Sequence, residues 1–109
     1  MSDDFDVSVD DAFGRDGGKA VLIKFSAPIV ELNVFVSVAD VGAVINFGRK
    51  GVDYVLAGES ANSAVHWKRD DGDVYILVGD DPEVWDISLV VDDGLIDKVA
   101  SQIQDLLGN

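Results

Sequence analysis

The sequence contains no cysteine, and this absence excludes disulfide frameworks, thiolate zinc sites and cysteine nucleophiles together. A reduced compartment readily tolerates such a composition, so we expect a cytoplasmic protein. No apolar run approaches the length that crosses a bilayer. The acidic start "MSDDFDVSVDD" also differs from a secretory signal, which is basic and then apolar. We therefore expect neither a membrane span nor a secretory leader.

Basic residues are scarce: 8 Lys and Arg stand against 21 Asp and Glu, for a net charge of -13. Nucleic-acid phosphates and anionic membranes should repel such a chain, so we expect a basic protein partner and no direct contact with nucleic acid or membrane. The charge is also uneven, at -5 for residues 1–11, +2 for residues 12–69 and -10 for residues 70–109. Solubility or adaptation to high salt would spread acids over the whole chain. The uneven distribution favours a directed acidic face instead.

Hydrophobic residues make up 48% of the 109 residues, enough for one core, and we expect a single domain over 1–109. Alternating apolar and polar residues predict strands over 5–10, 19–25, 32–38, 43–48, 64–69, 73–79 and 84–91. Pro28 is expected to break or shift the pairing before the third strand. The stretch 49–63 stays open between a strand with a loop and a helical turn. The turns "DDGD" and "GDDPE" make the last three strands an antiparallel meander.

The C-terminal segment predicts a helix of about 13 residues, because apolar residues recur at spacings of three and four. Asp92 or Asp93 can cap its start, and Gly108 stands where helices commonly end. The fold class is therefore α+β, a mainly antiparallel sheet of about six to seven strands with a C-terminal α-helix packed on one face. Phe25, Phe35, Trp67 and Trp85 are expected in the core.

No catalytic, metal or nucleotide motif fits its pattern. "GRDGGKA" (14–20) lacks the Ser or Thr that follows the lysine of a phosphate loop, and is expected to be a hairpin turn. "DFDVSVDD" and "DGDVYI" fail the calcium-loop spacing, and "GESAN" lacks the second glycine of a nucleophile elbow. His66, the single histidine, shares a strand face with Lys68 and is expected to be solvated. We expect no enzyme, no cofactor and no metal site, although the acidic turns could attract divalent ions adventitiously.

Antiparallel pairing should bring the acidic turns together. In a meander, alternate turns fall at the same end, so the turn near residue 71 should lie about 10 Å from the one near residue 92. The turn near residue 81 should lie at the opposite end. Turn and cap chemistry accounts for about half of these carboxylates. We predict a partner-binding surface formed by Asp70, Asp71, Asp73, Asp80, Asp81, Glu83, Asp86, Asp92 and Asp93.

These features favour a small acidic inhibitory binding protein. The most familiar kind is an immunity or antidote protein that masks a basic, nuclease-type toxin by electrostatic complementarity. One alternative is a phage or plasmid nucleic-acid mimic that inhibits a host defence or DNA-binding protein. Another is a structural domain that self-associates through "VYILVG" or through an edge strand such as "LNVFVSV". A monomer and a homodimer are both compatible with the first reading.

Overall fold

The computed structural model describes residues 6–13, 17–28, 30–60, 62–81 and 83–107. Seven strands and two helices follow one another along the chain: β1 (Asp6–Phe13), β2 (Lys19–Ala27), β3 (Val30–Ser37), α1 (Val41–Lys50), β4 (Tyr54–Ser60), β5 (Ser63–Asp70), β6 (Asp73–Asp81), β7 (Val84–Asp92) and α2 (Asp93–Leu106). The α+β class with a C-terminal helix is confirmed. None of the helices in these ranges is long and apolar enough to span a membrane.

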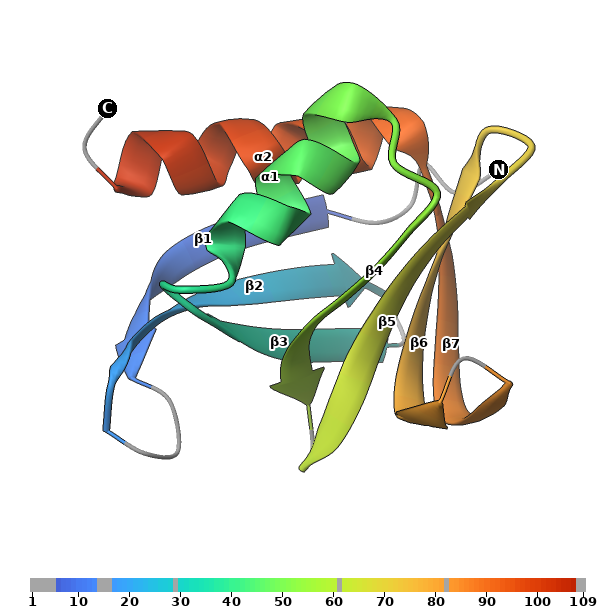
Figure 1. The fold of residues 1–109 in the computed structure, drawn as a ribbon, viewed down its shortest axis with the longest axis horizontal. Coiled ribbons are helices and arrows are strands. Elements are labelled where there is room, and N and C mark those ends of the chain that lie inside the picture. The colour runs from blue at the N-terminus through green and yellow to red at the C-terminus, as the bar shows by residue number, and fades with distance from the viewer. Residues whose placement is uncertain (1–5, 14–16, 29, 61, 82, 108–109) are drawn as a thin grey trace.

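The seven strands form one sheet in sequence order, and every pair of neighbours is antiparallel (Figure 1). The meander predicted for the last three strands therefore extends through the whole sheet. Among the described residues, its two halves, β1–β3 and β4–β7, are joined by one residue pair, Phe35 with Glu59. At this junction Gly58 has a φ of 85°, and a Cβ there would lie 2.8 Å from the Phe35 carbonyl oxygen. A side chain at position 58 would thus be strained in conformation and blocked by backbone.

Residues 43–48 are helical, so the prediction of a strand there is wrong. Val41, Val44 and Phe47 are the buried residues of α1, and their spacing of three places them on one stripe of a helix. The run "AVINFG" is too short for its apolar pattern alone to distinguish a helix from a strand. Gly48 lets α1 approach α2 closely, since a Cβ there would lie 3.1 Å from the Ile96 carbonyl oxygen.

The ends of the other elements mostly follow the sequence. The Asp92 side chain caps α2 by accepting from the Leu95 amide at 2.9 Å, while Gly108 lies outside the described residues. The stretch left open contains β4 and the turn into β5. Pro28 stands in the connection between β2 and β3, and their pairing starts unshifted at Ala27 and Val30. In the predicted turn 14–18, residues 14–16 lie outside the described residues.

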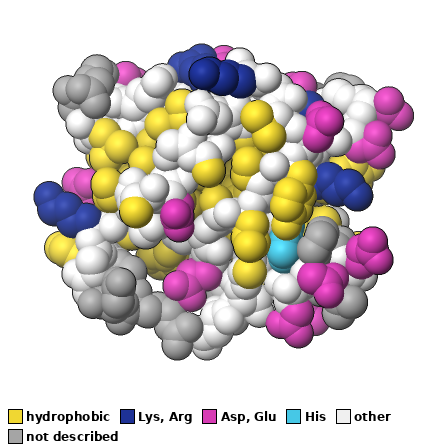
Figure 2. All heavy atoms as spheres, viewed as in Figure 1, with side chains coloured by type: hydrophobic (Ala, Val, Ile, Leu, Met, Phe, Trp, Pro, Cys, Tyr) yellow, Lys and Arg dark blue, Asp and Glu magenta, His cyan; other side chains and the backbone are white. Residues whose placement is uncertain are grey.

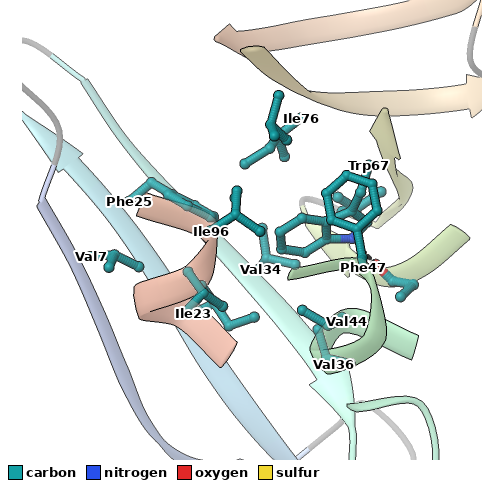
Figure 3. Packing of buried hydrophobic residues seen from close by; sticks show 14 of the residues in the cluster. Val7, Ile23, Phe25, Val34, Val36, Val44, Phe47, Trp67, Ile76 and Ile96 are labelled. Atoms are coloured by element: carbon teal, nitrogen blue, oxygen red, sulfur yellow. Dashed lines mark hydrogen bonds between the residues drawn. The ribbon is translucent and has the colours of Figure 1, made fainter. Parts of the chain in front are cut away.

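The core lies between one face of the curved sheet and the two helices, which lie across it (Figure 1). Trp67 is its largest fully buried side chain and packs against the rings of Phe25 and Phe47, at centroid distances of 6.1 and 6.2 Å. The indole N–H of Trp67 donates to the Ala57 carbonyl at 2.9 Å. Figure 3 shows Ile96 of α2 within the same cluster. The inner face of the sheet is thus closed by apolar packing.

Two of the four aromatic residues expected in the core are exposed. Phe25 and Trp67 are buried as predicted, but Phe35 is 37% and Trp85 47% exposed. Phe35 alternates with the buried Val34 and Val36 and therefore points to the other face of β3. "LNVFVSV" is also not an edge strand, because β3 has β2 on one side and β4 on the other.

Candidate partner-binding surface

The face of β4–β7 that points away from the helices carries an ordered array of side chains, here called the outer face. Alternate residues of each strand point to it. The strand register aligns them in rows: Asp70, Asp73 and Asp92; then Tyr54, Lys68, Tyr75 and Val90; then Leu56, His66, Leu77 and Ser88. The first row is acidic and the following rows are largely aromatic or apolar. Neither α1 nor α2 covers this array (Figure 1).

Trp85 joins the outer face because of an irregularity in β7. Ile87 pairs with Val78, but Trp85 pairs with Gly79, so Asp86 is left as an extra residue on β7. Such a bulge makes the side chains on its two sides differ in which face of the sheet they point to. Simple alternation predicted Trp85 on the inner face with Leu89 and Val91. The bulge instead leaves the indole 47% exposed.

The exposed indole forms one wall of a surface groove of about 340 Å³. We call it the Trp85 groove, and its lining consists of Lys68, Asp70, Tyr75, Leu77, Trp85 and Ser88. All six belong to β5, β6 or β7. The groove therefore sits on paired strands, which hold its walls in fixed positions. Sequence reasoning missed it, because Trp85 was expected in the core.

His66 is buried, at 3% exposure, so the prediction of a solvated histidine is wrong. Its ring stacks on Tyr54 at a centroid distance of 6.0 Å. Because the Gly79 carbonyl can only accept, Nε2–H donates to it at 3.2 Å, and Nδ1 accepts from the Tyr54 hydroxyl at 2.7 Å. The outer-face position was predicted correctly. The covering residue Tyr54 lies in the stretch that the sequence left open.

The register brings the carboxylates at the helix end of the sheet together. Asp70 pairs with Asp73, and Asp73 pairs with Asp92, so three acids stand on adjacent strands. Asp71 forms the turn between the first two, at a φ of 53°. Antiparallel pairing thus juxtaposes these residues, as the meander predicts.

Two of the nine predicted residues bind structural partners at the start of α2. The Asp92 side chain caps α2, and Asp93 accepts from the Arg69 guanidinium at 2.7 Å. Arg69 also donates to the carbonyls of Phe47 and Val52, and its guanidinium carbon lies 4.4 Å from the centre of the Phe47 ring. A basic residue from the middle of the chain therefore neutralises Asp93. These two exposed acids therefore serve the fold.

The other seven carboxylates are exposed and form what we call the acidic rim: Asp70, Asp71, Asp73, Asp80, Asp81, Glu83 and Asp86. At the far end of the sheet, the Asp81 side chain accepts from the Glu83 amide at 2.8 Å and shapes the turn. Across the ranges that the structure describes, no ion pair reaches any member of the rim. Figure 2 shows hydrophobic side chains over β4 and β5, with acidic side chains gathered on the right above and below them.

The rim gives the outer face a strong local charge. The seven rim carboxylates and Asp92 of the first row stand against Lys68 as the basic residue of the outer-face rows, a balance of -7. Within the described residues, no group of three or more His, Cys, Asp and Glu is arranged to hold a metal ion.

A larger hollow, of about 520 Å³, lies beside the last turn of α2. Asp11 and Lys19 are its two charged lining residues, together with apolar groups such as Phe13 and Val38. Their opposite charges balance, so this hollow favours neither sign of ligand. Its larger size alone does not make this hollow the better candidate, because the outer face has the greater local charge.

Comparisons of the chain with protein-family models, with curated proteins and with solved structures gave no match.

Proposed function

We propose that the protein is a small acidic inhibitory binding protein of the immunity or antidote kind, which masks a basic, nuclease-type toxin. The observation that carries this proposal is the acidic rim, whose seven exposed carboxylates have no ion pair within the described residues and flank an uncovered apolar face. Repulsion between these carboxylates destabilises the free protein. A cationic partner would relieve it.

The arrangement suits the two stages of protein association. Carboxylates at both ends of β5–β7 would steer a basic protein toward the outer face and raise the rate of encounter. The apolar centre, with Tyr54, Leu56 and Trp85 between 42% and 58% exposed, would then supply contact area that excludes water. Nuclease clefts are basic because they bind phosphates. An acidic face seated there would compete with the substrate without catalysing a reaction.

Two alternatives make different predictions about this surface. A nucleic-acid mimic needs carboxylates along one stripe, whereas the rim is divided between the two ends of β6 with apolar residues between them. This division favours complementarity to one protein cleft. Self-association by strand pairing through "VYILVG" is disfavoured, because β6 is hydrogen-bonded to β5 on one side and β7 on the other. A cytoplasmic location agrees with the proposal and is part of it.

The proposal is tested by affinity capture of a partner from the native host on the immobilised protein. Bound material is washed at 50 mM and at 500 mM salt, because rim contacts should weaken as salt screens them. The expected result is one basic protein, released by high salt, whose nuclease activity is lost when the acidic protein is added back. Capture that ignores salt, or a captured protein whose activity is unaffected, would overturn the proposal.

The matched control separates rim contacts from general charge. Replacing Asp70, Asp71 and Asp73 by Asn removes three rim charges, and Asn also tolerates the positive φ of position 71. Capture by this variant should fall at 50 mM salt. The variant D6N/D10N/D11N removes the same charge from exposed positions on β1 and should capture normally.

A further inference from the structure

We propose that the Trp85 groove accepts an arginine side chain of the basic partner. This inference deepens the proposed function and rests on it, because it assigns the central anchor of the interface. Interfaces gain most of their affinity from a few anchors seated in central pockets, and arginine is among the commonest of them. The groove lies between the two acidic ends of the outer face, where such an anchor would be expected.

The lining suits a guanidinium better than an ammonium. Trp85 and Tyr75 line the groove, and a planar guanidinium stacks well on aromatic rings. Asp70 supplies a carboxylate at one wall, and this carboxylate makes no ion pair with any described residue. The floor residue Leu77 is 4% exposed and can cover the methylene stem. Each part of an arginine side chain therefore finds a matching surface.

The floor of the groove is held in place before binding. Leu77 pairs with His66 across β5 and β6, and the His66 ring is fixed between the Tyr54 hydroxyl and the Gly79 carbonyl. Side chains that are already ordered lose little conformational freedom on binding. This preorganisation distinguishes the groove from the turn carboxylates, which stand in solvent.

Replacing Lys68 tests the charge of the ligand by the direction of its effect on binding. Lys68 lines the same groove and its ammonium should repel an incoming guanidinium, so Lys68→Gln is expected to strengthen binding of arginine. An anionic ligand would lose its counter-ion in the same variant and bind more weakly. An uncharged ligand would respond little. The direction of the Lys68 effect therefore identifies the charge of the ligand.

The experiment titrates the full chain with N-acetylarginine methylamide and follows the two indole N–H signals by NMR. Trp85 is exposed in the groove, whereas Trp67 is fully buried with its N–H bonded to Ala57. We expect saturable movement of the Trp85 signal at about millimolar concentration, weakened by salt, with Trp67 unmoved. N-acetylcitrulline methylamide, which has the same shape without the charge, should bind at least about fivefold more weakly. Equal binding of the two probes would overturn the proposal.

Three variants and one control variant complete the test. Asp70→Asn should weaken arginine binding about threefold, Lys68→Gln should strengthen it about twofold, and both keep the Trp85 signal as reporter. Weaker binding by Lys68→Gln would overturn the proposal. Trp85→Ala should lower capture of the basic partner at least about fivefold, while Phe35→Ala, at a similarly exposed aromatic on β3, should not. Unchanged capture by Trp85→Ala would contradict the assignment of the groove without contradicting the proposed function. Absence of a basic partner would contradict the proposed function itself.

Discussion

The two faces of β5–β7 use similar residues for opposite purposes. On the inner face, Trp67 is fully buried and the Arg69 side chain, 13% exposed, is bonded on several sides. On the outer face, Trp85 is 47% exposed, and the carboxylates of Asp70 and Asp73 make no ion pair with any described residue. An aromatic ring and a set of charges thus stabilise the fold on one side and stand uncovered on the other. Partners in space, rather than residue type, decide which role a side chain has.

This contrast has a consequence for stability. A buried ring contributes through packing, and its loss leaves a cavity, whereas an exposed ring loses little when it is truncated. A satisfied charge costs stability when its partner is removed, while unpaired carboxylates repel one another and gain when they are neutralised. The same substitution should therefore have different effects on the two faces.

The largest expected effect is on the inner face. Trp67→Ala should lower the free energy of unfolding by about 3–5 kcal/mol, because it empties the centre of the Phe25 and Phe47 cluster. Trp85→Ala should lower it by less than about 1 kcal/mol. Urea unfolding followed by far-ultraviolet circular dichroism measures both. Similar losses in the two variants would mean that the outer face is covered in solution.

Arg69 provides the next contrast. Arg69→Ala removes the donor to the Phe47 and Val52 carbonyls as well as the ion pair with Asp93, and should lower the free energy of unfolding by about 2–3 kcal/mol. Lys68→Ala, one residue earlier on the other face, should change it by no more than about 0.5 kcal/mol. The two midpoints of thermal unfolding give the comparison directly. A large effect at Lys68 would contradict the assignment of the two faces.

The sheet and its C-terminal helix could be predicted from the sequence because their patterns are local. Alternation identified six strands, and the spacing of Ile96, Val99 and Ile103 together with the cap at Asp92 identified α2. α1 could not be recognised, because a ten-residue helix with three buried positions has too short an apolar pattern to be told from a strand. Its helical state is fixed by packing against α2, which no local pattern reveals.

The candidate site was predicted only in part, for a similar reason. The carboxylates at the turns follow from strand order, so their juxtaposition could be deduced. The Trp85 groove depends on a bulge at Asp86, because this extra residue in β7 turns Trp85 to the outer face. The burial of His66 depends on Tyr54, which comes from a strand that the sequence did not define. Long-range pairing, rather than composition, creates these features.

A smaller effect separates the acids that serve the fold from those that do not. Asp92→Ala removes the cap of α2 and should lower the free energy of unfolding by about 1 kcal/mol. Asp71→Asn should change it by less than about 0.5 kcal/mol, because Asn accepts the same positive φ. Chemical denaturation of the two variants in parallel is the measurement. A loss at Asp71 as large as the loss at Asp92 would show that the rim acids also have structural partners.

The smallest effect on stability should accompany a clear effect on association. The variant D70N/D71N/D73N removes mutual repulsion between adjacent strands, so its free energy of unfolding should stay within about 0.5 kcal/mol of the parent or rise. Its association with the captured basic partner, measured by stopped flow, should slow roughly three- to tenfold at low salt and converge with the parent at high salt. D6N/D10N/D11N carries the same net charge, so its rate isolates position from charge. If both variants slowed equally, the outer face would have no special place in recognition, and net charge alone would account for the steering.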